Sequence, residues 1–114
     1  MMKYIVTLFS ILAASNVYSI GHVSNAKVTQ IRVDGDGKAM VYFNKPITGT
    51  PATCVHSAYK NALGVDAGTD GGKAVLSMVL AAKASGSLVT AYGLGVCGVY
   101  GGNTIETWNY GHIL

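Results

Sequence analysis

The sequence predicts a small α+β domain: a mainly antiparallel sheet of five strands, curled or closed into an OB-like barrel, with one helix between the third and fourth strands. Three features of the 114 residues support this prediction. Short runs of alternating apolar and polar residues lie on both sides of the one stretch whose apolar residues repeat with a helical period. An Asp-Gly turn joins the first two runs, and no internal repeat or linker divides the chain. Strands gathered around one helix are typical of the α+β class.

The strands follow from period-two patterns and from the turns that bound them. Within the first strand, Ile31 and Val33 share a face, and the repeated Asp-Gly pair at residues 34–37 is a strong hairpin signal before the second. A proline- and glycine-containing loop at 46–51 separates the second strand from the third. The predicted strands cover residues 24–33, 38–44, 54–60 with an extension toward 65, 88–92 and 104–114.

The helix is predicted over residues 72–85. Thr69 or Asp70 supplies the N-cap, because its side-chain oxygen can accept one of the unpaired N–H groups of the first turn, and Gly86 supplies the stop. Apolar residues repeat at i, i+3, i+4 and i+7, so one stripe of the helix should face the sheet. That stripe consists of Val75, Met78, Val79 and Ala82.

Leu76 and Leu80 give the same helix a second apolar face. A helix that is apolar nearly all round is usually buried on two sides, and a domain of this size has little chain left to cover the second side. We expect Leu76 and Leu80 either to form a subunit contact in a homo-oligomer or to pack under the loop at 46–51.

Residues 1–19 have the features of an export signal. A basic residue precedes an apolar stretch that is too short to anchor a protein in a bilayer, and a small-x-small pattern follows it. Cleavage is expected after Ser19, with cleavage after Ser15 as the alternative, and a buried N-terminal helix is the other interpretation of the segment. We therefore expect a secreted or periplasmic protein whose single mature domain spans residues 20–114.

Cys54 and Cys97 are the two cysteines of the chain. In an oxidising compartment an even count normally means pairing, so we expect one disulfide bond between them. Closing a loop of this length restricts the unfolded chain by roughly 4 kcal/mol in the entropy description of disulfides. Two free thiols, or half of a metal site, are the alternatives. A zinc site would need further ligands, and no CxxC or HxxxH spacing supplies them.

The charge pattern argues against nucleic-acid and membrane partners. Eight Lys and Arg residues against five Asp and Glu residues give a net charge of +3, and the basic residues are scattered along the chain rather than gathered into a run. Beyond the export signal, the sequence shows no second apolar span and no lipidation motif. We expect neither a nucleic-acid partner nor a membrane anchor.

Two short motifs fail on their sequence context. Residues 93–98 match the spacing of a dinucleotide-binding fingerprint, but no helix is predicted to begin there and hold a pyrophosphate, so no cofactor is expected. Residues 34–37 resemble the start of a calcium-binding loop. Lys38 and Lys45 occupy later positions at which that loop needs oxygen ligands, so a hairpin turn is the better interpretation.

No arrangement of residues indicates an enzyme. His56 and Ser57 are adjacent, which places their side chains on opposite faces of a strand, and no nucleophile elbow of the GxSxG type is present. Asp66, Asp70 and Glu106 are the acids available to a glycoside hydrolase, but nothing singles out a pair among them. We expect a protein without catalytic residues.

Aromatic and amide side chains gather in the last quarter of the chain. The candidate ligand-binding residues are Tyr92, Tyr100, Asn103, Trp108 and Tyr110, with Trp108 and Tyr110 expected on one strand face. Aromatic planes with nearby amides and hydroxyls suit sugar rings or a protein partner. In the other interpretation, Trp108 anchors the core and the tyrosines surround it.

His22 is a candidate metal ligand that depends on the processing site. Cleavage after Ser19 would leave His22 as the third residue of the mature chain. The terminal amine, two backbone nitrogens and the imidazole could then surround Cu(II) or Ni(II) in a plane. The alternative is an N-terminal tail in which His22 is merely solvated.

The helix and the glycine-rich turn together carry a resemblance. Residues 72–83, followed by Gly86, Val89 and 93–97, resemble a group of small exported proteins of Gram-negative bacteria that share the pattern GKAxLSxLLAA…G…V…GxGxC. The predicted layout is also similar to the OB-fold B subunits of AB-type toxins, of the subtilase-cytotoxin and pertussis-like kind. That likeness implies a glycan-binding pentamer whose helices line a central pore.

The function that we expect is therefore an exported, non-catalytic binding module that recognises a glycan or a cell surface. The alternative is a secreted structural or inhibitory protein that binds a protein partner.

Overall fold

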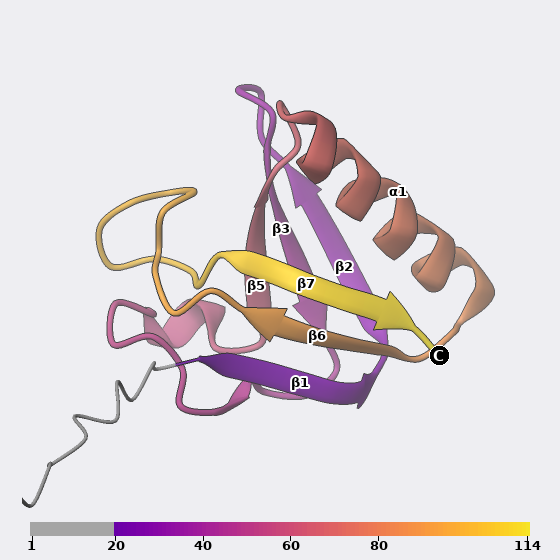
Figure 1. The fold of residues 1–114 in the computed structure, drawn as a ribbon, viewed down its shortest axis with the longest axis horizontal. Helices are drawn as coiled ribbons and strands as arrows, with labels where there is room; N and C mark the ends of the chain where they lie inside the picture. Colours follow the sequence, from indigo (N-terminus) through magenta and orange to yellow (C-terminus); the bar gives the residue numbers. More distant parts are fainter. Residues whose placement is uncertain (1–19) are drawn as a thin grey trace, which may run out of the picture.

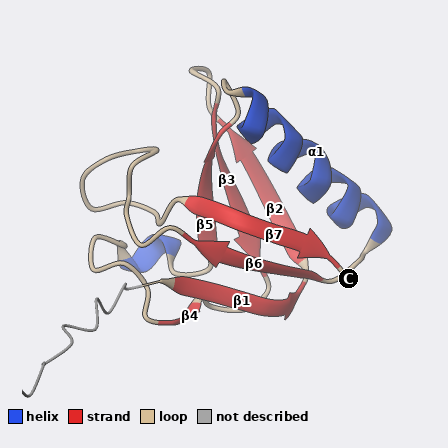
Figure 2. Cartoon of the chain, in the orientation of Figure 1, coloured by secondary structure: helices blue, strands red, loops and turns tan. Residues whose placement is uncertain are grey.

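The structure is a computed structural model that describes residues 20–114, and the expected export signal lies outside the described residues. In the described part of the chain, seven strands form two antiparallel sheets, accompanied by one α-helix and one short 3-10 helix (Figure 1, Figure 2). The α+β class is thus confirmed. The expected number of five strands was wrong, and the two sheets do not close into a barrel.

The strands are β1 (Gly21–Ala26), β2 (Val28–Val33), β3 (Lys38–Phe43), β4 (Thr48–Gly49), β5 (Ala62–Asp66), β6 (Val89–Gly93) and β7 (Trp108–Ile113). Sheet A has the strand order β4-β1-β6-β7, and sheet B has the order β2-β3-β5. The helices are η1 (Ser57–Tyr59) and α1 (Asp70–Ser85). The predicted hairpin turn at 34–37 joins β2 to β3, as the sequence indicated.

The predicted first strand is in fact two strands in two sheets. Asn25 has a φ of 50°, and the register between β1 and β6 shifts between Val23 and Ala26. Such an irregularity bends the strand, so β1 pairs in sheet A while β2 pairs with β3 in sheet B. The strand β4, which the sequence pattern did not indicate, adds two residues beside β1. These two differences raise the count from five strands to seven.

The predicted third strand starts later than expected. Residues 54–60 form turns and the helix η1, and β5 begins at Ala62. The His56 side chain caps η1 by accepting the Ala58 N–H at 3.1 Å. Such local side-chain bonds offer the backbone an alternative to a sheet ladder. Cys54 is bonded to Cys97, which confirms the predicted disulfide.

The helix α1 agrees with its prediction at both ends. The Thr69 hydroxyl accepts the Gly72 N–H at 3.0 Å, and Gly86 ends the helix in the left-handed conformation. The predicted stripe faces the core, since Val79 and Ala82 are buried while Val75 and Met78 pack partly against the same cluster.

The core lies between the two sheets and α1. The helix packs against β2, β5 and β7, and Figure 1 shows it alongside β2 and β7. A second, smaller cluster of Met40, Ala62 and Ile105 lies apart from this main core. The largest side chains of the main core are Trp108, Phe43, Leu63 and Ile47. This arrangement leaves one face of sheet A open to solvent, and the candidate site lies there.

Candidate functional site

Three rings form a row across the outer face of sheet A. The register places His22 of β1 opposite Tyr92 of β6, and Tyr92 opposite Tyr110 of β7. The ring centroids of His22 and Tyr92 are 5.9 Å apart, and those of Tyr92 and Tyr110 are 4.6 Å apart, with the planes stacked in both pairs. Their neighbours Val23 and Ala91 are buried, because successive side chains of a strand point to opposite faces. We call these three residues the ring row.

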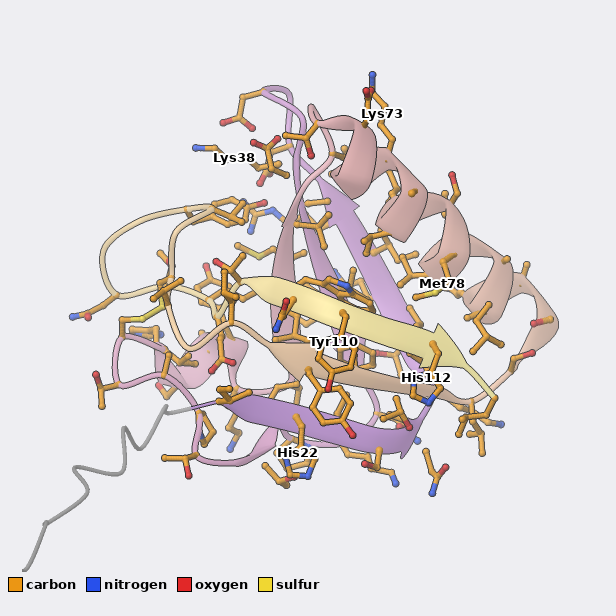
Figure 3. All side chains as sticks on the ribbon, viewed as in Figure 1. His22, Lys38, Lys73, Met78, Tyr110 and His112 are labelled. Atoms are coloured by element: carbon orange, nitrogen blue, oxygen red, sulfur yellow. A yellow bond between two sulfur atoms is a disulfide. The ribbon has the colours of Figure 1, made fainter. Side chains whose placement is uncertain are left out.

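The ring row is open at the edge of the sheet. Tyr110 is 55% exposed because no strand follows β7 in sheet A. The other two rings are half-buried. The next pair in the register, Thr90 and His112, projects on the same side, and Figure 3 shows His22, Tyr110 and His112 on the near face of the sheet. An aromatic face and several polar ring edges are thus available to a ligand.

Glu106 fixes the start of β1, the strand that carries His22 of the ring row. Its carboxylate is buried, with 1% of the residue exposed, and it accepts backbone N–H groups from Gly21 at 2.9 Å and Ala52 at 2.6 Å. A longer bond of 3.4 Å comes from Gly95. Gly93 lies so close that a Cβ there would collide with the carboxylate. Because backbone donors bond to both of its oxygens, Glu106 holds these chain segments together.

The sequence patterns did not indicate this role for Glu106. The one available signal is its position, since it is the single acid among the uncharged residues at 101–111. An isolated acid in a strand-like segment is expected on the surface unless it is paired. The donors that satisfy Glu106 come from three distant loops and strands, and no sequence spacing connects them.

Trp108 does not join Tyr92 and Tyr110 on the outer face. It is 8% exposed and belongs to the core. Its ring packs against Gly111, where a Cβ atom would lie only 2.7 Å from the ring. The register of β6 and β7 skips Asn109. Such a bulge turns the chain by one residue, so Trp108 and Tyr110 point to opposite faces. The expectation of a shared face was wrong, and the core interpretation of Trp108 holds.

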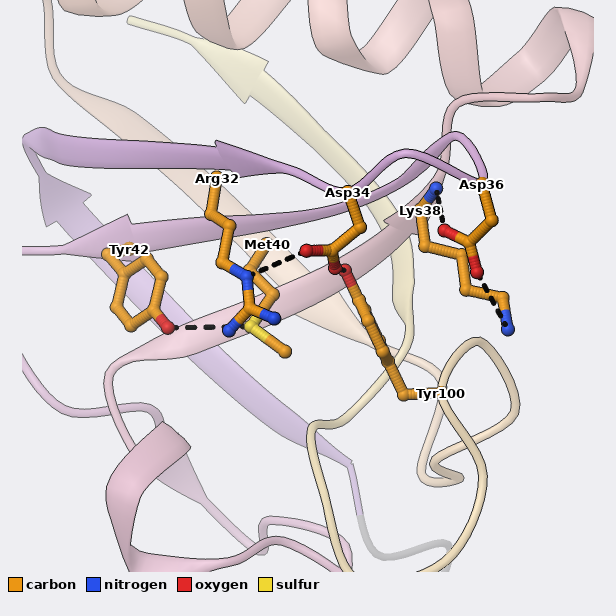
Figure 4. Close-up of polar contacts among 7 residues, drawn as sticks. All are labelled: Arg32, Asp34, Asp36, Lys38, Met40, Tyr42 and Tyr100. Carbon is orange, nitrogen blue, oxygen red and sulfur yellow. Dashed lines mark hydrogen bonds and ion pairs between the residues drawn. The ribbon is translucent and has the colours of Figure 1, made fainter.

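Tyr100 also lies away from the ring row. Its hydroxyl donates to Asp34 at 2.6 Å, and Asp34 also accepts the Arg32 Nε–H at 2.9 Å (Figure 4). The Tyr100 ring packs against the smaller hydrophobic cluster. These contacts fasten the loop after β6 to the hairpin between β2 and β3. Asn103 is exposed in that loop, so the five expected ligand residues do not form one site.

Asp34 and Tyr100 perturb each other's titration. The hydrogen bond from Tyr100, together with Arg32, holds the pKa of Asp34 below its usual value. Burial and the neighbouring Asp34 carboxylate raise the pKa of the Tyr100 phenol. This contact should therefore be sensitive to pH, unlike the apolar packing around it.

His22 lies in β1 rather than in an extended tail. The square-planar metal site expected at His22 would use the backbone nitrogen of Gly21, whose N–H donates to Glu106. Metal binding there would have to displace this bond. Within residues 20–114, no three His, Cys, Asp or Glu side chains lie close enough together to hold a metal ion.

Leu76 and Leu80 differ in their surroundings. Leu76 is partly buried against the core, whereas Leu80 is 50% exposed, so the loop at 46–51 does not cover it. The subunit contact through these residues stays a prediction.

Comparison with protein-family models, curated proteins and solved structures gives no match to this chain. In the part of the chain that the structure describes, no helix is both long and apolar enough to cross a membrane.

Proposed function

We propose that the protein is an exported, non-catalytic binding module and that its ligand is a glycan held at the ring row. The observation that carries the proposal is the stacked series His22, Tyr92 and Tyr110 on a solvent-facing sheet, outside the hydrophobic core. Aromatic side chains with polar tips favour surfaces where one part of the ligand is apolar and another is wet. A sugar ring has both properties.

The geometry suggests how the ligand would lie. The inner rings cover each other, so the open face of Tyr110 is the surface against which a sugar ring would stack. The polar edges of Tyr92, His22 and His112 would then supply hydrogen bonds to sugar hydroxyls. The resemblance of the sequence-predicted layout to toxin B subunits also favours a glycan, although no residue role is transferred from them.

Export is part of the same proposal. The bond between Cys54 and Cys97 is compatible with a secreted or periplasmic protein, because disulfides persist in oxidising compartments. The alternative function, binding of a protein partner, rests on the adjoining surface between β7 and α1, which shares Tyr110 with the ring row.

A glycan array with the purified mature protein tests the proposed function. Glycans that bind the wild type should lose at least about tenfold in affinity in Tyr110→Ala, which corresponds to about 1.4 kcal/mol. Leu94→Ala removes an equally open apolar side chain from the loop after β6 and is the matched control, with binding expected to be unchanged. No glycan bound by the wild type, or equal binding by both variants, would reject the proposal.

A further inference from the structure

The outer edge of β7 has unpaired backbone groups. The Leu114 N–H donates to the Leu88 carbonyl at 2.9 Å, and the register continues through Thr90 opposite His112. In an antiparallel ladder the hydrogen-bonded pairs alternate, so the N–H and C=O of Gly111 and Ile113 point away from β6. No hydrogen bond to these groups is formed by the residues at 20–114. Such an edge is a template for a further strand.

An apolar groove runs along this edge. Two adjoining pockets of about 290 Å³ each lie beside β7, one against α1 and the other against α1 and β5, and both are lined by Val75, Trp108 and Asn109. Met78 lines the pocket nearer the middle of the helix, and Figure 3 shows it on the side of α1 toward β7. Side chains of an added strand would therefore meet an apolar wall on the inner side of the sheet.

One end of the groove carries a negative charge. Asp66 is the single charged residue that lines either pocket within the described chain, and it lies at the pocket that also contains Thr107 and the first turn of α1. Its carboxylate accepts the Gly68 N–H at 2.9 Å and forms no ion pair with the described residues. The exposed Asp66 therefore favours a cation at this end, where β7 begins.

We propose that the β7 edge and the groove bind an extended segment of a partner protein as an additional strand of sheet A. The segment runs antiparallel to β7 and pairs with the free groups of Gly111 and Ile113. Its alternate apolar side chains enter the groove between Met78 and Trp108. A Lys or Arg near the C-terminal end of the segment lies beside Asp66, because an antiparallel strand ends where β7 begins.

The groove suits a single extended segment better than the edge of a second copy. The helix α1 packs against β7, so it closes the far side of the groove. An incoming sheet would need that space for its own second strand, at about 4.8 Å beyond the first. One strand with nothing beyond it avoids this collision.

Selection from a displayed library of random peptides tests the proposal with the purified wild-type protein. Enriched peptides should alternate apolar and polar residues and carry Lys or Arg toward the C-terminus. Without a partner these edge amides are expected to exchange fast, and a synthetic peptide of the enriched sequence should slow amide hydrogen exchange at Gly111 and Ile113.

Variants then locate the binding surface. Met78→Lys should weaken the peptide roughly tenfold or more, whereas Ala84→Lys, at an exposed position of the same helix, should leave affinity unchanged. Asp66→Asn, at an exposed residue, should weaken it about two- to fivefold and remove the preference for the basic residue.

Three outcomes would overturn the proposal. The first is a library without enriched peptides. The second is a peptide that binds Met78→Lys and Asp66→Asn as tightly as it binds the wild type. The third is protection of Gly111 and Ile113 in a peptide-free dimer, which would assign the edge to a second copy instead.

Discussion

Glu106 accepts the backbone N–H of Gly21 at 2.9 Å, although 85 residues separate the two in the sequence. Gly21 directly precedes His22, so this buried bond fixes the end of β1 that carries the ring row. The same carboxylate accepts the Ala52 N–H close to Cys54. One side chain thus joins the start of the domain, the disulfide-bearing loop and the segment between β6 and β7.

Replacement of Glu106 by Gln should destabilise the domain. The change keeps the size of the side chain but turns one acceptor oxygen into an NH₂ donor that faces a backbone N–H. We expect the free energy of unfolding to fall by about 1–3 kcal/mol, measured by urea titration. Asp36→Asn, at an exposed carboxylate, should change it by less than about 1 kcal/mol. Equal stability of the two variants would contradict this role for Glu106.

Gly93 should tolerate no side chain. A Cβ at Gly93 would collide with the Glu106 carboxylate, which cannot move without losing its backbone donors. Gly93→Ala is therefore expected to lower the free energy of unfolding by about 1–3 kcal/mol or more. Gly35→Ala adds the same methyl group to open space in the hairpin turn and should be nearly neutral. Thermal unfolding of both variants gives the comparison, and similar melting temperatures would refute it.

Tyr100→Phe should weaken the dependence of stability on acid. The folded-state pKa of Asp34 lies below its unfolded value, so its charged form stabilises the fold above about pH 4, and this contribution is lost as the pH falls through the folded pKa. The hydrogen bond from Tyr100 is the main cause of the shift. Without the hydroxyl, the urea midpoint should fall less steeply than in the wild type as the pH is lowered from about 5 to about 2. If the urea midpoints of the two proteins fell in parallel with pH, the contact between Tyr100 and Asp34 would not contribute to the pH dependence of stability.

Leu80→Glu should break a homo-oligomer without unfolding the domain. Leu80 is half exposed on α1, so a charge there costs little in a monomer but is unfavourable inside a subunit contact. Light scattering should show an oligomer for the wild type and a monomer for Leu80→Glu. Leu94→Glu, at a similarly exposed position in a loop, should leave the assembly intact. A wild type that is monomeric at micromolar concentration would remove the predicted contact.

The elements that could be predicted from the sequence depend on neighbouring residues. Thr69 and Gly86 bound α1 because capping is a local property of the backbone, and the stripe that includes Val79 follows from the helical repeat. The pairing of Cys54 with Cys97 follows from their number. Two tyrosines of the candidate site, Tyr92 and Tyr110, were predicted from the gathering of aromatic residues in the last quarter of the chain.

The remaining features depend on register and on contacts between distant segments. A one-residue bulge at Asn109 sends Trp108 into the core and leaves Tyr110 outside, because each step along a strand reverses the side-chain direction. Likewise, His22 joins the ring row only because β1 pairs with β6. The sequence by itself determined the class of the domain, its helix and its disulfide. Only the tertiary structure decided which face each ring takes, since period-two alternation fixes relative directions and the sheet register sets the absolute ones.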